Sequence, residues 1–308
     1  MSAFLEKPVA SQSKDEKRLF LKHGPIELVI EVEGVTLGDR KAAYRAAHAA
    51  FQTILPELCS ELALLRSSPD PKRAIPESVV GLAMYRTVLP FAETSFVTPM
   101  IAVAGSVADY VLQSMLGAAK LTKAFVNNGG DIALYLNEGE TFELGICSDI
   151  GSGTIQKSIT LSAFDNIGGV ATSGWKGRSH SLGIADAVTV FAENAATADC
   201  AATLIANAVD APNAPQIERQ AANILAPDSD LGECLVTVGV GQLSGLDIDE
   251  ALNRGADVAQ SFADCGLIAS AYLSLQGCNS VVTLDEAAQP NILTELGARQ
   301  AHDGETYA

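Results

Sequence analysis

Hydrophobic residues recur at three- and four-residue intervals in several segments of the chain, which is the spacing of one face of an α-helix. The segments predicted to be helices are residues 40–66, 79–90, 102–116, 196–209 and 249–262. Asp247 or Asp249 is the expected cap of the last helix, because a carboxylate there accepts hydrogen bonds from the first free backbone amides.

Shorter apolar runs, bounded by Gly, Pro and Asn, are typical of β-strands. They cover residues 23–35, 124–127, 132–136, 142–147, 158–161, 168–172, 187–192 and 235–240, whereas residues 268–275 fit either a strand or a helix. Pro25 opens the first run and makes it a predicted edge strand. Since helices and strands interleave without a regular βαβ rhythm, the pattern predicts an α+β fold with layered mixed sheets and packed helices.

The chain has enough apolar material for a sizeable core. Its 308 residues suit two average domains or one large domain, and 48% of them are hydrophobic against 19% charged. We expect one folded domain, residues 19–284, between a flexible N-terminal tail, residues 1–18, and a polar C-terminal tail, residues 285–308.

Charge and cysteine usage narrow the class of protein. The chain has 20 Lys and Arg against 37 Asp and Glu, a formal charge of −17, which repels nucleic acid and anionic lipid. We expect neither a transmembrane span nor a secretory signal, because the apolar runs are short and broken by polar residues. The six cysteines are scattered without a C-x-x-C pair, so neither a disulfide framework nor a zinc site is expected. These features predict a cytoplasmic protein with no nucleic-acid or membrane partner.

The first polar segment with candidate chemistry is Asn127-Asn128-Gly129-Gly130-Asp131, at the exit of a predicted strand. Adjacent glycines let the backbone adopt positive φ and approach a ligand closely, while the amides and the carboxylate can hold a polar group. The same residues also form an ordinary Asn-Gly hairpin turn, which is the simpler interpretation when the segment is taken alone.

The second segment, residues 171–181, concentrates hydrogen-bond donors and cations between glycines. Its candidate residues are Thr172, Ser173, Gly174, Trp175, Lys176, Arg178, Ser179 and His180. Backbone amides together with Lys176 and Arg178 suit an anionic or heterocyclic ligand. Ser173 and His180 are candidates for nucleophile and base, but no G-x-S-x-G elbow is present, so binding is favoured over nucleophilic catalysis.

The third segment begins the alanine-rich helix. Asp199 and Thr203 are four residues apart and therefore lie one turn apart on the same helical face. A carboxylate and a hydroxyl are hard oxygen ligands that suit Mg²⁺. Spacing alone favours plainer roles, in which Asp199 complements the helix dipole and Thr203 bonds back to the helix.

Together, these three segments resemble the ApbE-like superfamily. Gly129-Gly130-Asp131, Thr172-Ser173-Gly174 and Asp199-x-x-x-Thr203 occur in the order of its Gly-Gly-Asp, Thr-Ser-Gly and Ala-Asp-Ala-x-x-Thr motifs. Two further stretches, residues 98–109 and 177–186, are similar to the UPF0280 branch of that superfamily. The resemblance covers residues 24–245 and implies an ApbE-like α+β fold.

The superfamily is known for FAD:protein FMN transferases, and the resemblance implies which residues form the site. Asp199, Thr203 and the backbone at Ala104 would hold Mg²⁺. The two glycine-flanked segments would line a ligand pocket, with Asp131 as a candidate for metal ligation or acid–base chemistry. The chain departs from the transferase pattern where Ala104-Gly105 replaces Lys-Gly and where a His-Ile-Ile-Asp-Pro-like excursion is missing.

We therefore expect a cytoplasmic ApbE-like enzyme that acts on a small polar, anionic or heterocyclic substrate by hydrolysis or group transfer, with Mg²⁺ assistance. The alternative is an FAD- or FMN-binding protein, or an FMN transferase-like protein. The sequence leaves the oligomeric state open, with a homodimer as the commonest outcome for soluble oligomers.

Overall fold

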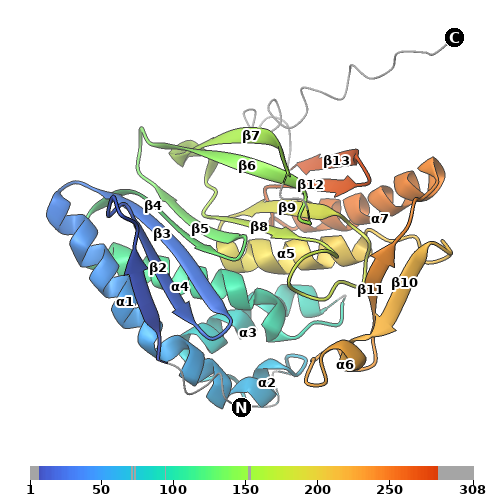
Figure 1. Ribbon diagram of the computed structural model, residues 1–308, viewed down its shortest axis with the longest axis horizontal. Coiled ribbons are helices and arrows are strands. Elements are labelled where there is room, and N and C mark those ends of the chain that lie inside the picture. Colours follow the sequence, from blue (N-terminus) through green and yellow to red (C-terminus); the bar gives the residue numbers. More distant parts are fainter. Residues whose placement is uncertain (1–6, 71, 73, 94, 152–153, 284–308) are drawn as a thin grey trace, which may run out of the picture. The chain divides into compact units, whose positions relative to one another are not determined.

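The computed structural model describes residues 7–70, 72, 74–93, 95–151 and 154–283 (Figure 1). The predicted α+β class is confirmed. The described chain forms two compact units, each built from three separate segments. Unit 1 comprises the residues up to Glu140, Asn166–Ala171 and Phe191–Cys200; unit 2 comprises Thr141–Asp165, Thr172–Val190 and the residues from Ala201 onward. The expected domain over residues 19–284 includes parts of both units, and the expected C-terminal tail lies outside the described residues.

In unit 1, antiparallel strands follow the order β1-β2-β3-β4-β5, and β8 pairs with β5. The strands are β1 (Val9–Gln12), β2 (Arg18–His23), β3 (Ile26–Gly34), β4 (Leu121–Asn128), β5 (Asp131–Leu136) and β8 (Gly169–Ser173). Burial alternates along β3, where Leu28, Ile30 and Val32 are buried. One face of the sheet therefore contributes to the core.

Two expectations about this sheet are wrong. The strand opened by Pro25 is an inner strand between β2 and β4, because Pro25 lies in the preceding turn and leaves the ladder intact. Val9–Gln12, expected in the flexible tail, form β1 and pair with β2. All four residues of β1 are exposed, so the sequence carries no alternating apolar signal there.

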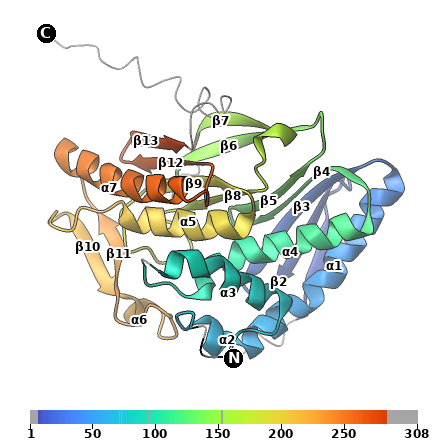
Figure 2. The ribbon, with the colours of Figure 1, turned by 180° about the vertical axis from the view of Figure 1, so that it is seen from behind.

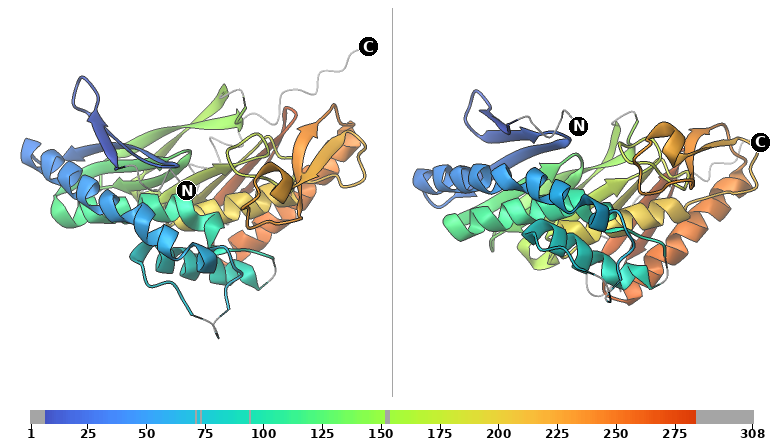
Figure 3. Two further views of the ribbon diagram at one scale, coloured as in Figure 1. Left: turned by 60° about the horizontal axis from the view of Figure 1, so that its bottom comes forward. Right: turned by 90° about the horizontal axis from the view of Figure 1, so that it is seen from below.

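Helices cover one face of these strands, as Figures 2 and 3 show. They are α1 (Leu37–Ser60), α3 (Val79–Ala92) and α4 (Val103–Ala118). The helix expected over residues 40–66 is interrupted at Glu61, beyond which the short α2 (Leu62–Leu65) follows. Glu61 accepts hydrogen bonds from the amide (3.0 Å) and the hydroxyl (2.5 Å) of Ser78, which caps α3. The interruption therefore fixes the start of α3.

The 3₁₀ turn η2 (Pro99–Ala102) continues into α4, and the combined segment is more apolar than the sequence analysis expected. The segment has 20 residues and a mean hydropathy of 1.3 over its most apolar window. By length and composition alone, it could span a membrane. In the structure α4 contacts α1, α3, β4 and β5, and Val107, Val111 and Met115 are completely buried. The segment is the core helix of unit 1.

In unit 2, β9 (Ala187–Ala192) neighbours β12 (Ser270–Leu275), which pairs antiparallel with β13 (Cys278–Thr283). Residues 268–275 thus contain a strand rather than a helix. Helix α7 (Gly245–Asp264) packs on β12 and β13 (Figure 2). Ser244 caps α7 in place of the expected Asp247 or Asp249, because its hydroxyl accepts a hydrogen bond from the Asp247 amide (3.2 Å).

Two separate hairpins complete unit 2. One joins β6 (Thr141–Asp149) to β7 (Thr154–Ser162), and the 3₁₀ turn η3 (Ala163–Asp165) follows it. The other joins β10 (Ile217–Ala221) to β11 (Leu235–Val240), with α6 (Ala222–Leu225) between them. Helix α5 (Ala195–Ala208) belongs to unit 1 as far as Cys200.

Candidate functional site

The Gly-Gly-Asp segment is a tight hairpin turn in unit 1. Gly129 and Gly130 connect β4 to β5 with φ values of 70° and 119°, which L side chains rarely adopt. The side-chain oxygen of Asn127 accepts a hydrogen bond from the Gly130 amide (2.9 Å). The turn therefore has the structural role that the simpler interpretation predicted, and it fixes Asp131 as the first residue of β5.

Helices α4 and α5 cap each other where they cross in unit 1. The Asp199 carboxylate of α5 accepts hydrogen bonds from the amides of Gly105 (3.0 Å) and Ala104, in the first turn of α4. In return, the Asp109 carboxylate of α4 accepts hydrogen bonds from two amides in the first turn of α5, including that of Ala195 (3.0 Å). A Cβ at Gly105 would overlap the Ala195 carbonyl, so only glycine permits the crossing.

The crossing holds carboxylates in an environment that disfavours their charge. Burial raises the pKa of Asp131 well above its ordinary value, and the negative charge of Asp199 raises it further. Burial also raises the pKa of Asp199 to about 7, against the lowering effect of the Gly105 and Ala104 amides. Within the described residues, no lysine or arginine contributes to these shifts.

Burial raises the pKa of Asp109 to about 6, although its hydrogen bonds to the first amides of α5 act in the opposite direction. Its carboxylate is therefore also costly to ionise. Because the Asp109 carboxylate lies at the N-terminus of α5, its role is to cap that helix.

The donors around Asp199 suit a small divalent cation. Carboxylate oxygens come from Asp131 and Asp199, and the Ala104 carbonyl is held by a hydrogen bond from the Asn128 side-chain amide (3.1 Å). Thr203 lies one turn beyond Asp199 on α5. Across the described part of the chain, no three His, Cys, Asp or Glu side chains gather into a metal-binding group. A metal at Asp199 would therefore need backbone, hydroxyl and water oxygens as well, which is the coordination that Mg²⁺ prefers.

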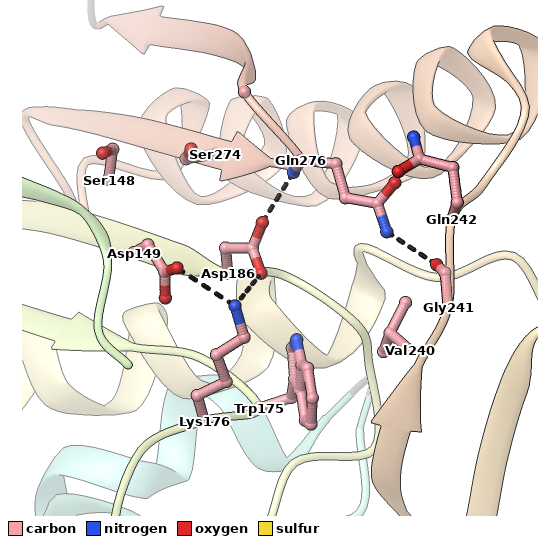
Figure 4. Close-up of a pocket in the computed structure, with 11 residues that line it drawn as sticks. Ser148, Asp149, Trp175, Lys176, Asp186, Val240, Gly241, Gln242, Ser274 and Gln276 are labelled. Carbon is pink, nitrogen blue, oxygen red and sulfur yellow. Dashed lines mark hydrogen bonds and ion pairs between the residues drawn. The ribbon is translucent and has the colours of Figure 1, made fainter. Parts of the chain in front are cut away.

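A cavity of about 500 Å³ lies within unit 2 (Figure 4). Small-molecule sites commonly measure roughly 300–1,000 Å³. Five segments line the cavity: Ser148 and Asp149; Trp175 and Lys176; Asp186; Val240, Gly241 and Gln242; and Ser274, Gln276 and Gly277. The cavity is thus large enough for a small organic ligand and is assembled from segments far apart in the sequence.

Lys176 bridges two carboxylates in this cavity. Its ammonium lies 3.1 Å from a carboxylate oxygen of Asp149 and 3.1 Å from one of Asp186. Burial opposes the charge on Lys176, but hydrogen bonds to Asp149 and Asp186 outweigh that effect and raise its pKa. The ammonium also lies 5.4 Å from the centre of the Trp175 ring, within the range of a cation–π contact.

The other residues expected in the ligand-binding loop have varied surroundings. The Thr172 hydroxyl lies 2.9 Å from that of Thr189, and Gly174 is buried against the Asp186 backbone. Besides Thr172 and Gly174, four more of the expected residues do not line the cavity: Ser173 and His180, which are half-buried, and Arg178 and Ser179, which are exposed. Among the described residues, no hydrogen bond joins Ser173 to His180.

Sequence reasoning did not single out Asp149, Asp186 or Gln276 as site residues. Asp186 ends the stretch 177–186 that resembles the UPF0280 branch, so a signal for it was present. Asp149 ends β6 and Gln276 follows β12, and only the fold brings these distant residues to one cavity.

The family is decided by comparison with known proteins. Residues 10–282 match the protein-family model described as "AbpE bacteria". The chain belongs to this ApbE-like family. It is also similar to the UPF0280 protein of Methanopyrus kandleri, with 34% identity over 224 residues, or 69% of this chain and 86% of that protein. The predicted UPF0280 relationship is thus confirmed.

Other relatives give the same family and show how far the similarity extends. The UPF0280 protein of Methanothermobacter thermautotrophicus is 32% identical over 187 residues, covering 59% of this chain and 72% of that protein. The UPF0280 protein of Methanococcoides burtonii is 43% identical over 112 residues, 36% of this chain and about half (45%) of its own length. The solved ApbE protein of Thermotoga maritima is 14% identical, with a TM-score of 0.51 over 92% of this chain and 98% of that one, which relates the two folds.

Proposed function

We propose that this ApbE-like chain binds Mg²⁺ at the carboxylates of unit 1 and acts on a small polar substrate, anionic or heterocyclic, by metal-assisted hydrolysis or group transfer. The observation that carries the proposal is the pair Asp131 and Asp199, two half-buried carboxylates that interact electrostatically, with no compensating cation among the described residues.

A buried pair of like charges is costly to the fold. Removing an ionised carboxylate from water is unfavourable unless it is paired or bound to a metal, and a second carboxylate beside it adds repulsion. Groups kept in such surroundings cluster at functional sites, although structural networks also contain them. A divalent cation would remove both the desolvation penalty and the repulsion, which is why we assign one here.

The residues of this chain have separate roles in the proposed site. Asp199 and Thr203 of α5, with the Ala104 carbonyl, are the proposed metal ligands. The Gly105 amide orients Asp199, and Asn128 orients Ala104. When bound, Mg²⁺ would polarise an oxygen of the substrate and neutralise developing negative charge. Asp131 is assigned to ligation or acid–base chemistry.

Metal binding can be tested by thermal unfolding of the chelator-treated protein with and without MgCl₂. We expect Mg²⁺ to raise the Tm of the wild type, because a ligand that binds only the folded state stabilises it. The rise should be absent in Asp199→Asn and retained in Asp109→Asn, whose carboxylate caps α5; its loss or retention in Asp131→Asn decides between ligation and acid–base chemistry for Asp131. Equal Mg²⁺ stabilisation of Asp199→Asn would contradict the assignment.

Membership of the ApbE-like family favours a second candidate, an FAD- or FMN-binding protein or an FMN transferase-like protein. Incubation with FAD and Mg²⁺ distinguishes these candidate functions. Release of AMP with transfer of flavin to a threonine-containing peptide would support the transferase, whereas a yellow protein without AMP release would support a flavin binder. Absence of flavin binding would leave the first candidate.

We propose the cytoplasm as the compartment. All six cysteines, each within the described residues, are free thiols. Reduced thiols are the usual state in that compartment.

A further inference from the structure

We propose that the cavity of unit 2 binds a planar, amino-substituted nitrogen heterocycle, with its amino groups on Asp149 and Asp186 and its ring beside Trp175. The inference goes beyond the proposed function, because every residue that it uses belongs to unit 2 and none requires a metal.

The charge of the cavity selects against an anion. Its charged residues are Asp149, Asp186 and Lys176, and the single ammonium is already shared between both carboxylates. The formal charge of the three side chains is therefore −1. An incoming anion would compete with two carboxylates for one lysine, whereas a donor-rich ligand would add hydrogen bonds to acceptors that carry excess negative charge.

The carboxylates retain acceptor capacity for such donors. One oxygen of Asp149 accepts a hydrogen bond from the Gly151 amide (2.8 Å), and the other meets Lys176 (3.1 Å). A carboxylate accepts several hydrogen bonds through its two oxygens, so Asp149 can also act as an acceptor for donors of a ligand. The Asp149 side chain is 33% exposed and that of Asp186 is 11% exposed, so Asp149 is the principal contact for a ligand.

Trp175 adds a requirement for an acceptor on the ligand. Its indole nitrogen is buried and has no hydrogen-bond partner among the described residues. Figure 4 shows this nitrogen at the end of the indole that faces Lys176 and Asp186. A buried donor without a partner is costly, and a ring nitrogen or carbonyl oxygen of the ligand would satisfy it after a small movement of the ring. A ligand with donors and an acceptor on one planar edge, such as an aminopyrimidine, meets both requirements.

The opposite wall of the cavity is already formed. The Gln276 side-chain amide donates to the Gly241 carbonyl (2.8 Å) and accepts from the Leu243 amide (3.1 Å). The Gln276 backbone amide donates to Asp186 (2.6 Å), although Gln276 has a φ of +46° that non-glycine residues seldom adopt. This hydrogen bond holds one oxygen of Asp186 before any ligand binds, and preorganisation of this kind lowers the cost of binding.

The single tryptophan makes the proposal testable. Trp175 is the only tryptophan of the chain, so its fluorescence reports directly on the cavity. The chelator-treated protein is titrated with 2,4-diaminopyrimidine, with unsubstituted pyrimidine and with a pyrimidine carboxylate, orotate, and each titration is repeated by calorimetry. We expect saturable binding of 2,4-diaminopyrimidine, with weaker binding of pyrimidine and no binding of orotate.

Variants then separate the roles of the charged residues. Asp149→Asn should weaken 2,4-diaminopyrimidine binding about tenfold or more, as expected for loss of a hydrogen bond to a charged group. Glu143→Gln, an exposed carboxylate on the same strand β6, should leave binding unchanged. Lys176→Met should strengthen the binding, because it removes the cation that competes for both carboxylates.

Three outcomes would overturn the proposal. They are the absence of saturable 2,4-diaminopyrimidine binding by both methods, preferential binding of orotate, and equal weakening by Asp149→Asn and Glu143→Gln. Orotate binding that Lys176→Met abolishes would show that Lys176 recruits an anion instead. Because a chelator is present throughout, failure here is distinguishable from failure of the metal site in unit 1.

Discussion

Both units hold a pair of aspartates, but only one pair has a cation of its own. In unit 2, Lys176 lies between Asp149 and Asp186 at 3.1 Å from each. In unit 1, Asp131 and Asp199 interact electrostatically, the backbone of α4 donates hydrogen bonds to Asp199, and burial raises the pKa of both carboxyls. The same residue type thus experiences opposite electrostatic conditions in the two units.

The difference indicates what each pair is suited to bind. A pair that already shares a lysine has less need of a metal ion and is suited to hydrogen bonding with a polar ligand. A pair without a lysine can be neutralised by protons or by a metal cation. The predictions below alter one side of this contrast at a time.

The helix crossing that holds Asp199 should be the most sensitive feature. Gly105→Ala places a Cβ against the backbone of Ala195, which cannot move without shifting α5, so we expect about 3 kcal/mol of destabilisation. Gly117→Ala on the same helix is the control, because a Cβ there meets nothing within 4 Å, and it should stabilise by about 0.5–1 kcal/mol. Urea unfolding of both variants measures the difference. Similar effects of the two substitutions would show that the crossing is not tightly packed.

The pH dependence of stability should differ between the metal-free and metal-bound protein. The folded-state pKa of Asp199, about 7, lies above its unfolded value, so the folded state binds more protons between these values. Stability from this group is therefore complete below the unfolded pKa and is lost as the pH rises through 7. Between pH 5 and pH 7 the metal-free protein should lose about 2 kcal/mol in urea unfolding. Saturating Mg²⁺ should reduce that loss; a loss unchanged by Mg²⁺ would separate the titration from metal binding.

How far the sequence predicted these features depended on the kind of signal. Strands β9 and β11 were predicted with their observed bounds, because apolar, β-branched runs between turn residues are typical of strands. Strand β10 (Ile217–Ala221) was missed because its residues are polar or half-exposed and show no period of two. The interruption at Glu61 was missed because it depends on hydrogen bonds to Glu77 and Ser78, beyond a long loop.

The two candidate sites differ in the same way. Asp131 and Asp199 were selected because each lies in a motif that resembles the ApbE-like family, and the structure brings them within electrostatic contact. Asp149 lies outside any such motif. Its role depends on a contact with Lys176, which lies in the segment after strand β8. Spacing along the chain does not reveal this contact.

Removing one member of the unit 1 pair should stabilise the metal-free protein. Asp131→Asn keeps the shape of the side chain but cannot ionise, so both the burial cost and the repulsion from Asp199 disappear. We expect about 1.5 kcal/mol of stabilisation at pH 7.5, a size typical of single substitutions. At pH 5 the difference should be smaller, because the protonated fraction of a carboxyl with a raised pKa grows as the pH falls. Destabilisation at both pH values in urea unfolding would mean that Asp131 makes a favourable charged interaction.

Removing Lys176 should leave the aspartate pair of unit 2 without a cation, like the aspartate pair of unit 1. Lys176→Met leaves Asp149 and Asp186 without their shared cation, and we expect about 1 kcal/mol of destabilisation at pH 7, since the lysine side chain is partly exposed. Adding Asp149→Asn should recover part of that loss, and the double-mutant cycle in urea unfolding measures the coupling. Lys22→Met is the control, because the Lys22–Glu27 pair is largely exposed and should contribute less. Equal losses of stability from the two lysine variants would show that the shared, partly buried position of Lys176 adds no stability. The electrostatic contrast between the two units would then have no measurable effect on the free energy of unfolding.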